Sequence, residues 1–176
     1  MRTVALIGQS PRDKADEPLQ FADFECVAHF DGACEPVNPG GHGGWGFVIR
    51  AVEDGQLGAE LATGAGYIPA GRQTTNNVAE YTAALEAVRA WLRLERSTPL
   101  LVCGDSKLVI MQMRGQWQVK QGAYVPVYRE LRALVDAHAL AVKWQWVPRD
   151  QNARADELSK IELVKRGIPI TVRRES

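Results

Sequence analysis

Four acidic residues stand where a folded chain could bring their carboxylates together: Asp31, Glu80, Asp105 and Asp156. Each has an ordinary explanation when considered alone. Asp31 precedes a glycine, which is typical of a turn at a strand end, and Asp105 precedes Ser106, as in a helix cap. Glu80 and Asp156, in first helical turns, would complement helix dipoles. As a set, their oxygens are the hard ligands that Mg²⁺ or Mn²⁺ prefers, so the pattern indicates a candidate metal site.

The predicted elements favour convergence of these acids. Asp31 follows the first strand and Asp105 the fourth, and we expect these strands to be adjacent and parallel. Open α/β sheets place ligand sites at the carboxyl ends of such strands. The alanines within residues 83–87 make the Glu80 side of its helix small enough to approach the sheet. Four converging carboxylates would repel one another without cations, so the pattern predicts two metal ions and phosphodiester hydrolysis.

Hydrophobic periodicity and turn signals predict the elements that would position the acids. Strands are expected over 24–30, 45–52, 57–68, 99–103 and 141–147, and helices over 76–94, 106–113, 125–138 and 153–166. The glycine-rich residues 33–44 read as a loop, and Thr75 as an N-cap. This order predicts an α/β fold with a five-stranded mixed sheet, in which a three-strand antiparallel meander joins two parallel strands, with helices on both faces.

Length and composition predict one soluble domain. The chain has 176 residues, of which 45% are apolar, and its 21 basic residues balance 21 acidic ones, so no global field attracts a polyanion. We expect a flexible N-terminal tail over 1–20, a catalytic domain over 21–166 and a C-terminal tail over 167–176, which could add a strand, touch substrate or stay loose. No apolar run reaches the roughly 20 residues of a membrane helix, and the start does not resemble a signal peptide.

The three cysteines, Cys26, Cys34 and Cys103, lack the number and spacing of a disulfide framework or a zinc site. A reducing compartment fits them best. We therefore expect a cytoplasmic protein. We also expect a monomer with no membrane partner.

Four motifs resemble, in order, those of type 1 ribonuclease H: Phe30-Asp-Gly-Ala-Cys34 with Asn38-Pro-Gly40, Thr75-Asn-Asn-Val-Ala-Glu80, Gly104-Asp-Ser106 and Asn152-Ala-Arg-Ala-Asp156. The match covers about residues 24–160. It implies a ribonuclease H-like fold and an endonuclease that hydrolyses the RNA strand of RNA/DNA hybrids, leaving 3′-hydroxyl and 5′-phosphate ends. It also implies that the four carboxylates are catalytic and bind two Mg²⁺ ions, for which Mn²⁺ would substitute.

The resemblance also implies substrate contacts. Thr75, Asn76 and Asn77 match positions that touch the DNA backbone and minor groove, although hydrogen bonding at a helix start would also explain the asparagines. Cys34, Asn38 and Asn152 match positions near the RNA, where short polar groups can recognise a ribose 2′-hydroxyl. Trp117 matches a tryptophan near the DNA strand, with core packing as the alternative.

Two departures distinguish this chain from many bacterial members. The stretch 147–152 holds no histidine where those members carry a loop histidine, so Arg149 would contact phosphate in its place, or contact nothing. Residues 114–120 lack the basic protrusion, which predicts weaker and more salt-dependent substrate binding. We assign no substrate role to Trp91, Trp144 or Trp146, which we expect to pack in the helices and strands.

Two other functions would also fit this fold. One is a hybrid-binding module without catalysis, which loss of a carboxylate would have favoured. The other is another nuclease of the same general fold, such as an integrase, transposase or exonuclease. Neither is favoured, because all four carboxylates and the Thr-Asn-Asn-x-x-Glu stretch are present.

Overall fold

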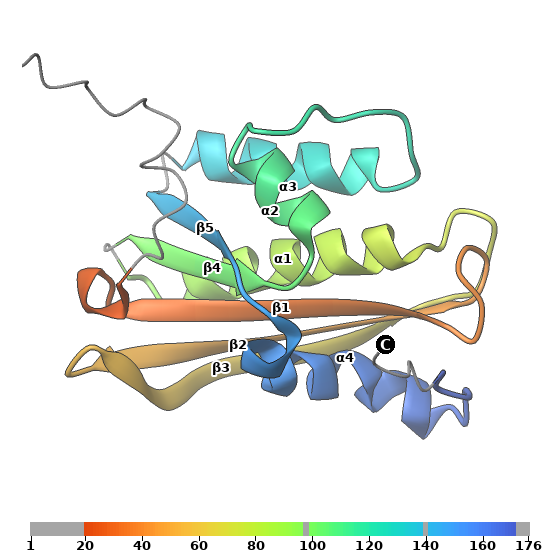
Figure 1. Cartoon of the computed structure of the whole chain (residues 1–176), viewed down its shortest axis with the longest axis horizontal. Helices are drawn as coiled ribbons and strands as arrows, with labels where there is room; N and C mark the ends of the chain where they lie inside the picture. The colour runs from red at the N-terminus through yellow and green to blue at the C-terminus, as the bar shows by residue number, and fades with distance from the viewer. Residues whose placement is uncertain (1–19, 97–98, 139–140, 172–176) are drawn as a thin grey trace, which may run out of the picture.

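The computed structural model describes residues 20–96, 99–138 and 141–171. The predicted N-terminal tail, except Gln20, and the end of the predicted C-terminal tail, residues 172–176, lie outside the described residues. At the centre is one mixed sheet of five strands in the order β3-β2-β1-β4-β5 (Figure 1). The predicted sheet is therefore confirmed.

The strands form a meander followed by two parallel additions. Antiparallel pairing joins β1 to β2 and β2 to β3, whereas β4 lies parallel to both β1 and β5. All five residues of β4 are buried, as expected for a short apolar strand inside a sheet. The bounds are β1 (Cys26–Glu35), β2 (His42–Glu53), β3 (Gln56–Ile68), β4 (Leu100–Gly104) and β5 (Val142–Trp146).

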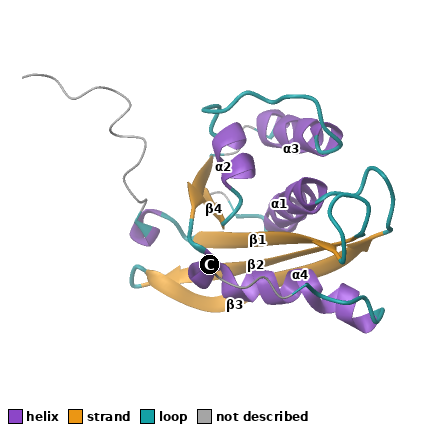
Figure 2. Ribbon diagram, turned by 45° about the vertical axis from the view of Figure 1, so that its right-hand side comes forward, coloured by secondary structure: helices purple, strands orange, loops and turns teal. Residues whose placement is uncertain are grey.

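Helices cover both faces of the sheet. On one face lie α1 (Asn76–Arg93), α2 (Lys107–Met113) and α3 (Val125–Ala137), and on the other lies α4 (Ala153–Lys165) (Figure 2). Two short 3₁₀ turns, η1 (Phe21–Asp23) and η2 (Arg149–Asn152), precede β1 and α4. The main core forms under α1, where Phe30, Tyr81 and Trp144 are buried together. None of the helices in the described ranges is long and apolar enough to cross a membrane.

Local signals predicted these helices well. The Thr75 hydroxyl accepts a hydrogen bond from the Val78 N–H at 3.1 Å, so it is the N-cap of α1. Ser106 caps α2 in the same way through Val109. Glu80 is the fifth residue of α1 and so lies beyond its first turn, which contains no acidic residue. The dipole explanation for Glu80 is therefore weakened, while Asp156 does lie in the first turn of α4.

The interpretation of Asp31-Gly32 as a turn was wrong. Strand β1 runs through both residues to Glu35, and Asp31 pairs with Gly46 of β2. Glycine is needed here because α1 lies against the strand: a Cβ on Gly32 would stand 2.2 Å from the Glu80 backbone nitrogen. Close helix packing, and not chain reversal, thus explains this glycine. The connecting loop is correspondingly shorter than predicted, since β2 already begins at His42.

Candidate active site

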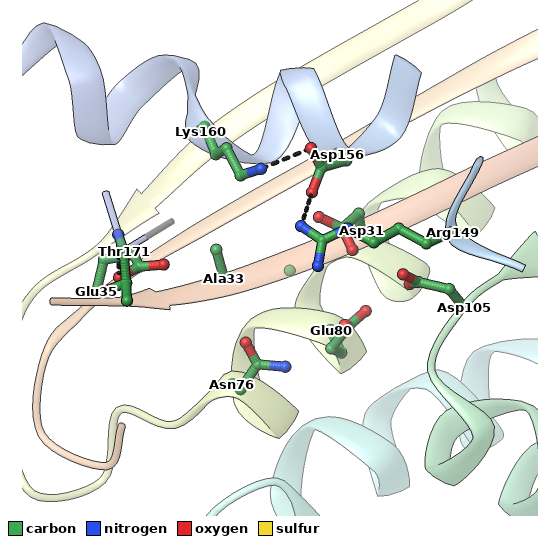
Figure 3. A pocket seen from close by; sticks show the side chains of 11 residues that line it. Asp31, Ala33, Glu35, Asn76, Glu80, Asp105, Arg149, Asp156, Lys160 and Thr171 are labelled. Atoms are coloured by element: carbon green, nitrogen blue, oxygen red, sulfur yellow. Dashed lines mark hydrogen bonds and ion pairs between the residues drawn. The ribbon is translucent and has the colours of Figure 1, made fainter. Parts of the chain in front are cut away.

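Three carboxylates meet where β1, β4 and α1 come together. Asp31 lies in β1 just beyond the last parallel pair, His29 with Cys103, and Asp105 directly follows β4. Glu80 projects from α1, whose alanines at 83, 84 and 87 are fully buried. One oxygen from each of the three carboxylates lies within 4.8 Å of the others (Figure 3). The predicted convergence of these acids on one pocket is therefore observed.

The three acids lie close enough to repel one another, and two of them are buried. Asp31 is 6% exposed and Glu80 5%. Burial, and then the negative charge of Asp105, raise the pKa of Asp31 to about 7, although hydrogen bonding from Ser159 opposes this rise. Burial, and then Asp31 and Asp105, raise the pKa of Glu80 well above its usual value. The protein thus holds negative charge at a site that favours a cation or a proton.

The donor set fits a divalent cation. The Glu80 Oε2 atom is buried and has no hydrogen-bond partner within residues 20–96, 99–138 and 141–171. A buried oxygen normally has a partner, so this one calls for water or a metal ion. The three candidate ligands are all carboxylates, which is the ligand chemistry of Mg²⁺ and Mn²⁺ more than of zinc.

The fourth carboxylate stands apart from this cluster. Asp156 lines the same pocket but lies outside the group whose oxygens approach within 4.8 Å. Its Oδ1 accepts from Arg149 at 3.0 Å and its Oδ2 from Lys160 at 2.6 Å, as the dashed lines in Figure 3 show. Arg149, expected to contact phosphate or nothing, is therefore paired with Asp156 in this structure. Lys160 was not predicted, although its position one turn after Asp156 gave the signal.

Three further side chains hold the aspartates, and the sequence assigned this function to none of them. The Ser159 hydroxyl donates to Asp31 Oδ2 at 2.7 Å. The Asn152 amide donates to the Phe30 carbonyl at 2.9 Å and lies 3.4 Å from Asp105 Oδ1. The Trp146 indole donates to the Asp105 carbonyl at 3.0 Å. Trp146 is 37% exposed, so the expectation that it simply packs in the strands was wrong, whereas Trp91 and Trp144 are buried.

The residues predicted to contact substrate divide into exposed and buried sets. Asn38 lies in the loop between β1 and β2, where its Oδ1 accepts from the Asn76 N–H at 3.0 Å, and Asn77 is exposed beside it at the start of α1. Cys34 and Asn152 are instead buried, at 3% and 1% exposure. The Cys34 thiol donates to the Val37 carbonyl at 3.2 Å, so it holds the loop in place.

Trp117 lies in the loop between α2 and α3. It is 47% exposed, which excludes core packing as its explanation. Residues 114–124, which include it, form turns and irregular chain between the two helices. Their tryptophan is thus available to a partner molecule.

Glu35 and Thr171 close the other end of the pocket. The Thr171 N–H donates to Glu35 Oε2 at 3.0 Å, and the Thr171 hydroxyl to the Pro36 carbonyl at 3.3 Å. The predicted C-terminal tail therefore returns to the end of β1 at Thr171, which lines the pocket.

Comparisons of sequence link the chain to known nucleases. A family profile described as reverse transcriptase-like matches residues 29–161. The ribonuclease H of Neisseria gonorrhoeae is 36% identical over 154 residues, which cover 78% of this chain and 94% of that protein. A bifunctional protein of Mycobacterium tuberculosis is 34% identical over 122 residues, which cover 69% of this chain. The match spans only 31% of that longer relative.

Comparisons of structure agree with the sequence matches. The N-terminal RNase H domain of a Mycobacterium tuberculosis protein superposes with a TM-score of 0.69 and 31% identity, over 82% of this chain and 98% of that one. LC11-RNase H1, solved in complex with an RNA/DNA hybrid, superposes with a TM-score of 0.67 and 28% identity, over 80% and 99% of the two chains. The predicted ribonuclease H-like fold is confirmed.

Proposed function

Because the chain belongs to the ribonuclease H family, we propose that it is an endonuclease of type 1 that hydrolyses the RNA strand of RNA/DNA hybrids. The observation that carries this proposal is the cluster of Asp31, Glu80 and Asp105, with its unpartnered buried oxygen. The substrate class is supported by LC11-RNase H1, which was solved with such a hybrid. Its reaction would leave 3′-hydroxyl and 5′-phosphate ends.

Asp31, Glu80, Asp105 and Asp156 would hold two Mg²⁺ ions, with Mn²⁺ as a substitute. When bound, such ions activate a water molecule and stabilise the leaving oxygen. The chain's own contribution is to fix the carboxylates against their mutual repulsion and to present Arg149 and Lys160 beside Asp156. In this proposal Arg149 also meets a phosphate of the substrate, in the place of the missing loop histidine.

Substrate recognition would come from the exposed edge around the pocket. Asn38, Thr75, Asn76 and Asn77 lie together where the β1–β2 loop meets α1, and are proposed to contact the two strands in the minor groove. Cys34 and Asn152 are both buried, so contact with RNA would involve their main chains more than their side chains. Trp117 would pack against the DNA strand from the irregular loop that replaces a basic protrusion.

The remaining expectations also stand as proposals. Residues 21–166 would form the catalytic domain, since the elements from η1 to α4 span 21–165. The three cysteines are free and buried, which fits a reducing cytoplasm. A monomer is expected, and light scattering after size-exclusion chromatography would test that.

An end-labelled RNA annealed to DNA tests the activity. We expect internal RNA cuts with Mg²⁺ or Mn²⁺, none in EDTA, and none with Asp105→Asn. Duplex DNA, double-stranded RNA and single strands serve as comparison substrates. Binding of the hybrid without cleavage under every metal condition would favour a non-catalytic module, and cleavage of duplex DNA would favour another nuclease class.

A further inference from the structure

Asn152 does not act as the helix cap that its position suggests. It precedes α4 at the N-cap position, where an asparagine side chain ordinarily accepts from the helix backbone. No such side-chain bond forms, and the residue is 1% exposed. Its amide nitrogen instead donates to the Phe30 carbonyl at 2.9 Å and approaches Asp105 Oδ1 at 3.4 Å. Asn152 therefore spans from β1, one residue before Asp31, to the acid that follows β4.

Ser159 reaches the other aspartate from the same helix. It lies seven residues after Asn152, about two turns along α4, so both side chains face the sheet. Ser159 is fully buried, and its Oγ lies 2.7 Å from Asp31 Oδ2 and 2.8 Å from the Asp156 carbonyl. A hydroxyl has one proton, and the charged carboxylate is the stronger acceptor. The hydroxyl thus occupies Oδ2 and leaves Oδ1 of Asp31 for other ligands.

Glycines in β2 make this reach possible. A Cβ on Gly46 would lie 2.4 Å from the Ser159 nitrogen, and one on Gly44 would lie 2.1 Å from the Ser159 carbonyl oxygen. The backbone of α4 therefore lies directly on β2, and Asp31 pairs with Gly46 across the β1–β2 ladder. This contact brings a short serine side chain to an acid on the next strand.

From these contacts we propose that Asn152 and Ser159 are positioning residues, which fix Asp105 and Asp31 in the arrangement that binds divalent metal. The inference rests on the proposed metal-dependent function and deepens it. Asn152 keeps an unpartnered, buried Oδ1 among the described residues, as Glu80 keeps Oε2. A buried polar atom normally has a partner, so each of these oxygens has room for a further hydrogen bond or a ligand.

The test measures metal binding directly, without substrate. Mn²⁺ is titrated calorimetrically into the full-length protein and into Asn152→Ala, Ser159→Ala and Ser159→Thr. Loss of a group that orients a ligand typically weakens metal affinity by about 10- to 100-fold, and we expect this for both alanine variants. Ser159→Thr retains the hydroxyl and should restore most of the affinity.

Gln112→Ala is the matched control. Gln112 is a buried amide outside the pocket, which bonds the hydroxyls of Tyr81 and Tyr124. Its loss should lower the unfolding temperature and leave Mn²⁺ affinity unchanged. If Asn152→Ala does not fold, Ser159→Ala alone decides the outcome for Asp31.

Unchanged Mn²⁺ affinity in the alanine variants would overturn the proposal. So would a raised KM for the hybrid at unchanged Mn²⁺ affinity, since that would make Asn152 an RNA contact. In support, kcat should fall at limiting metal and recover in part at high metal, with KM for the hybrid unchanged. If the wild-type protein binds Mn²⁺ but does not cut the hybrid, the proposed function is wrong. The positioning roles of Asn152 and Ser159 are still tested by Mn²⁺ affinity in that case.

Discussion

The four predicted metal-binding carboxylates face the same pocket but divide into two groups, a cluster of three and Asp156 by itself, with different electrostatic surroundings. Asp31, Glu80 and Asp105 lie close together, and no basic side chain in the described residues forms an ion pair with any of them. Asp156 has two such partners, Arg149 and Lys160. The first group therefore lacks a direct ion-pair partner among the described residues, whereas the protein itself already balances the charge of the fourth acid.

The two surroundings have different effects on the stability of the folded state. Burying like charges without a partner is unfavourable, and the raised pKa values of Asp31 and Glu80 express that cost. The Asp156 pairs are partly exposed, and such pairs contribute little to stability. Substitutions in the two groups should therefore affect activity and stability in different proportions.

The largest effect is expected from Asp31→Asn. Cleavage of the hybrid should fall by about a thousandfold or more, since metal ions contribute several kcal/mol to the transition state. In EDTA the same variant should unfold at a higher temperature than the wild type, because a buried charge and its repulsion are gone. A cleavage assay and a thermal melt measure the two effects. A lower melting temperature in EDTA would contradict the electrostatic argument.

A smaller loss is expected from Asp156→Asn. Activity should fall by about 10- to 100-fold, because three carboxylates remain in place. Stability in EDTA should stay within about 1 kcal/mol of the wild type, or fall slightly, since the partly exposed pairs to Arg149 and Lys160 are lost. Glu157→Gln, the neighbouring exposed acid, is the control and should leave cleavage unchanged. If Asp156→Asn stabilised the protein in EDTA as much as Asp31→Asn does, the proposed electrostatic difference between the two groups would be wrong.

The pH dependence of stability should report the first group together with His29, whose pKa burial lowers to about 4. Asp31 binds its proton with a pKa of about 7 in the folded protein against 3.8 as the ordinary value, and the pKa of Glu80 is raised as well. Between about pH 4 and pH 7 these two acids therefore hold more protons in the folded state than in the unfolded state, whereas His29 holds fewer in the folded state up to its ordinary pKa of 6.5. The contribution of the acids to the free energy of unfolding in EDTA should fall as pH rises through this range, by at most about 1.4 kcal/mol per pH unit for each proton.

Chemical denaturation at several pH values measures this slope. Asp31→Asn should reduce it, and Mg²⁺ should flatten it, because a bound cation keeps the carboxylates ionised. His29 is present in both proteins, so equal slopes in the wild type and in Asp31→Asn would show that Asp31 is not a group that titrates in this range.

The smallest effect is expected from Arg149→Gln. Release of Asp156 from one cation should tighten Mn²⁺ binding by a few-fold, while loss of a positive charge beside the pocket should weaken hybrid binding by a few-fold. Calorimetry and a binding titration separate the two changes. Arg166→Gln, a surface substitution on the same protein with a like change in charge, should alter neither value.

Much of the fold followed from local patterns. Thr75 is the N-cap of α1, as predicted, and Ser106, in the cap-like Asp105-Ser106 pair, is the N-cap of α2. The apolar run that forms β4 is wholly buried. Caps, turns and periodicity act over a few residues, so the sequence contains their signals directly. The error at Asp31-Gly32 arose because an Asp-Gly pair is common in turns, but glycine is also required where a helix packs closely on a strand, as α1 does on β1.

The sequence thus reveals which acidic residues matter, their order along the chain and the chemistry that they favour. Only the tertiary structure decided which oxygens meet, since Asp31, Glu80 and Asp105 come from three separate elements, while Asp156 turns to Arg149 and Lys160. It also decided that Asn152 and Ser159 serve the aspartates and that Trp146 is exposed. These contacts join residues up to 128 positions apart, and no local propensity encodes such a distance.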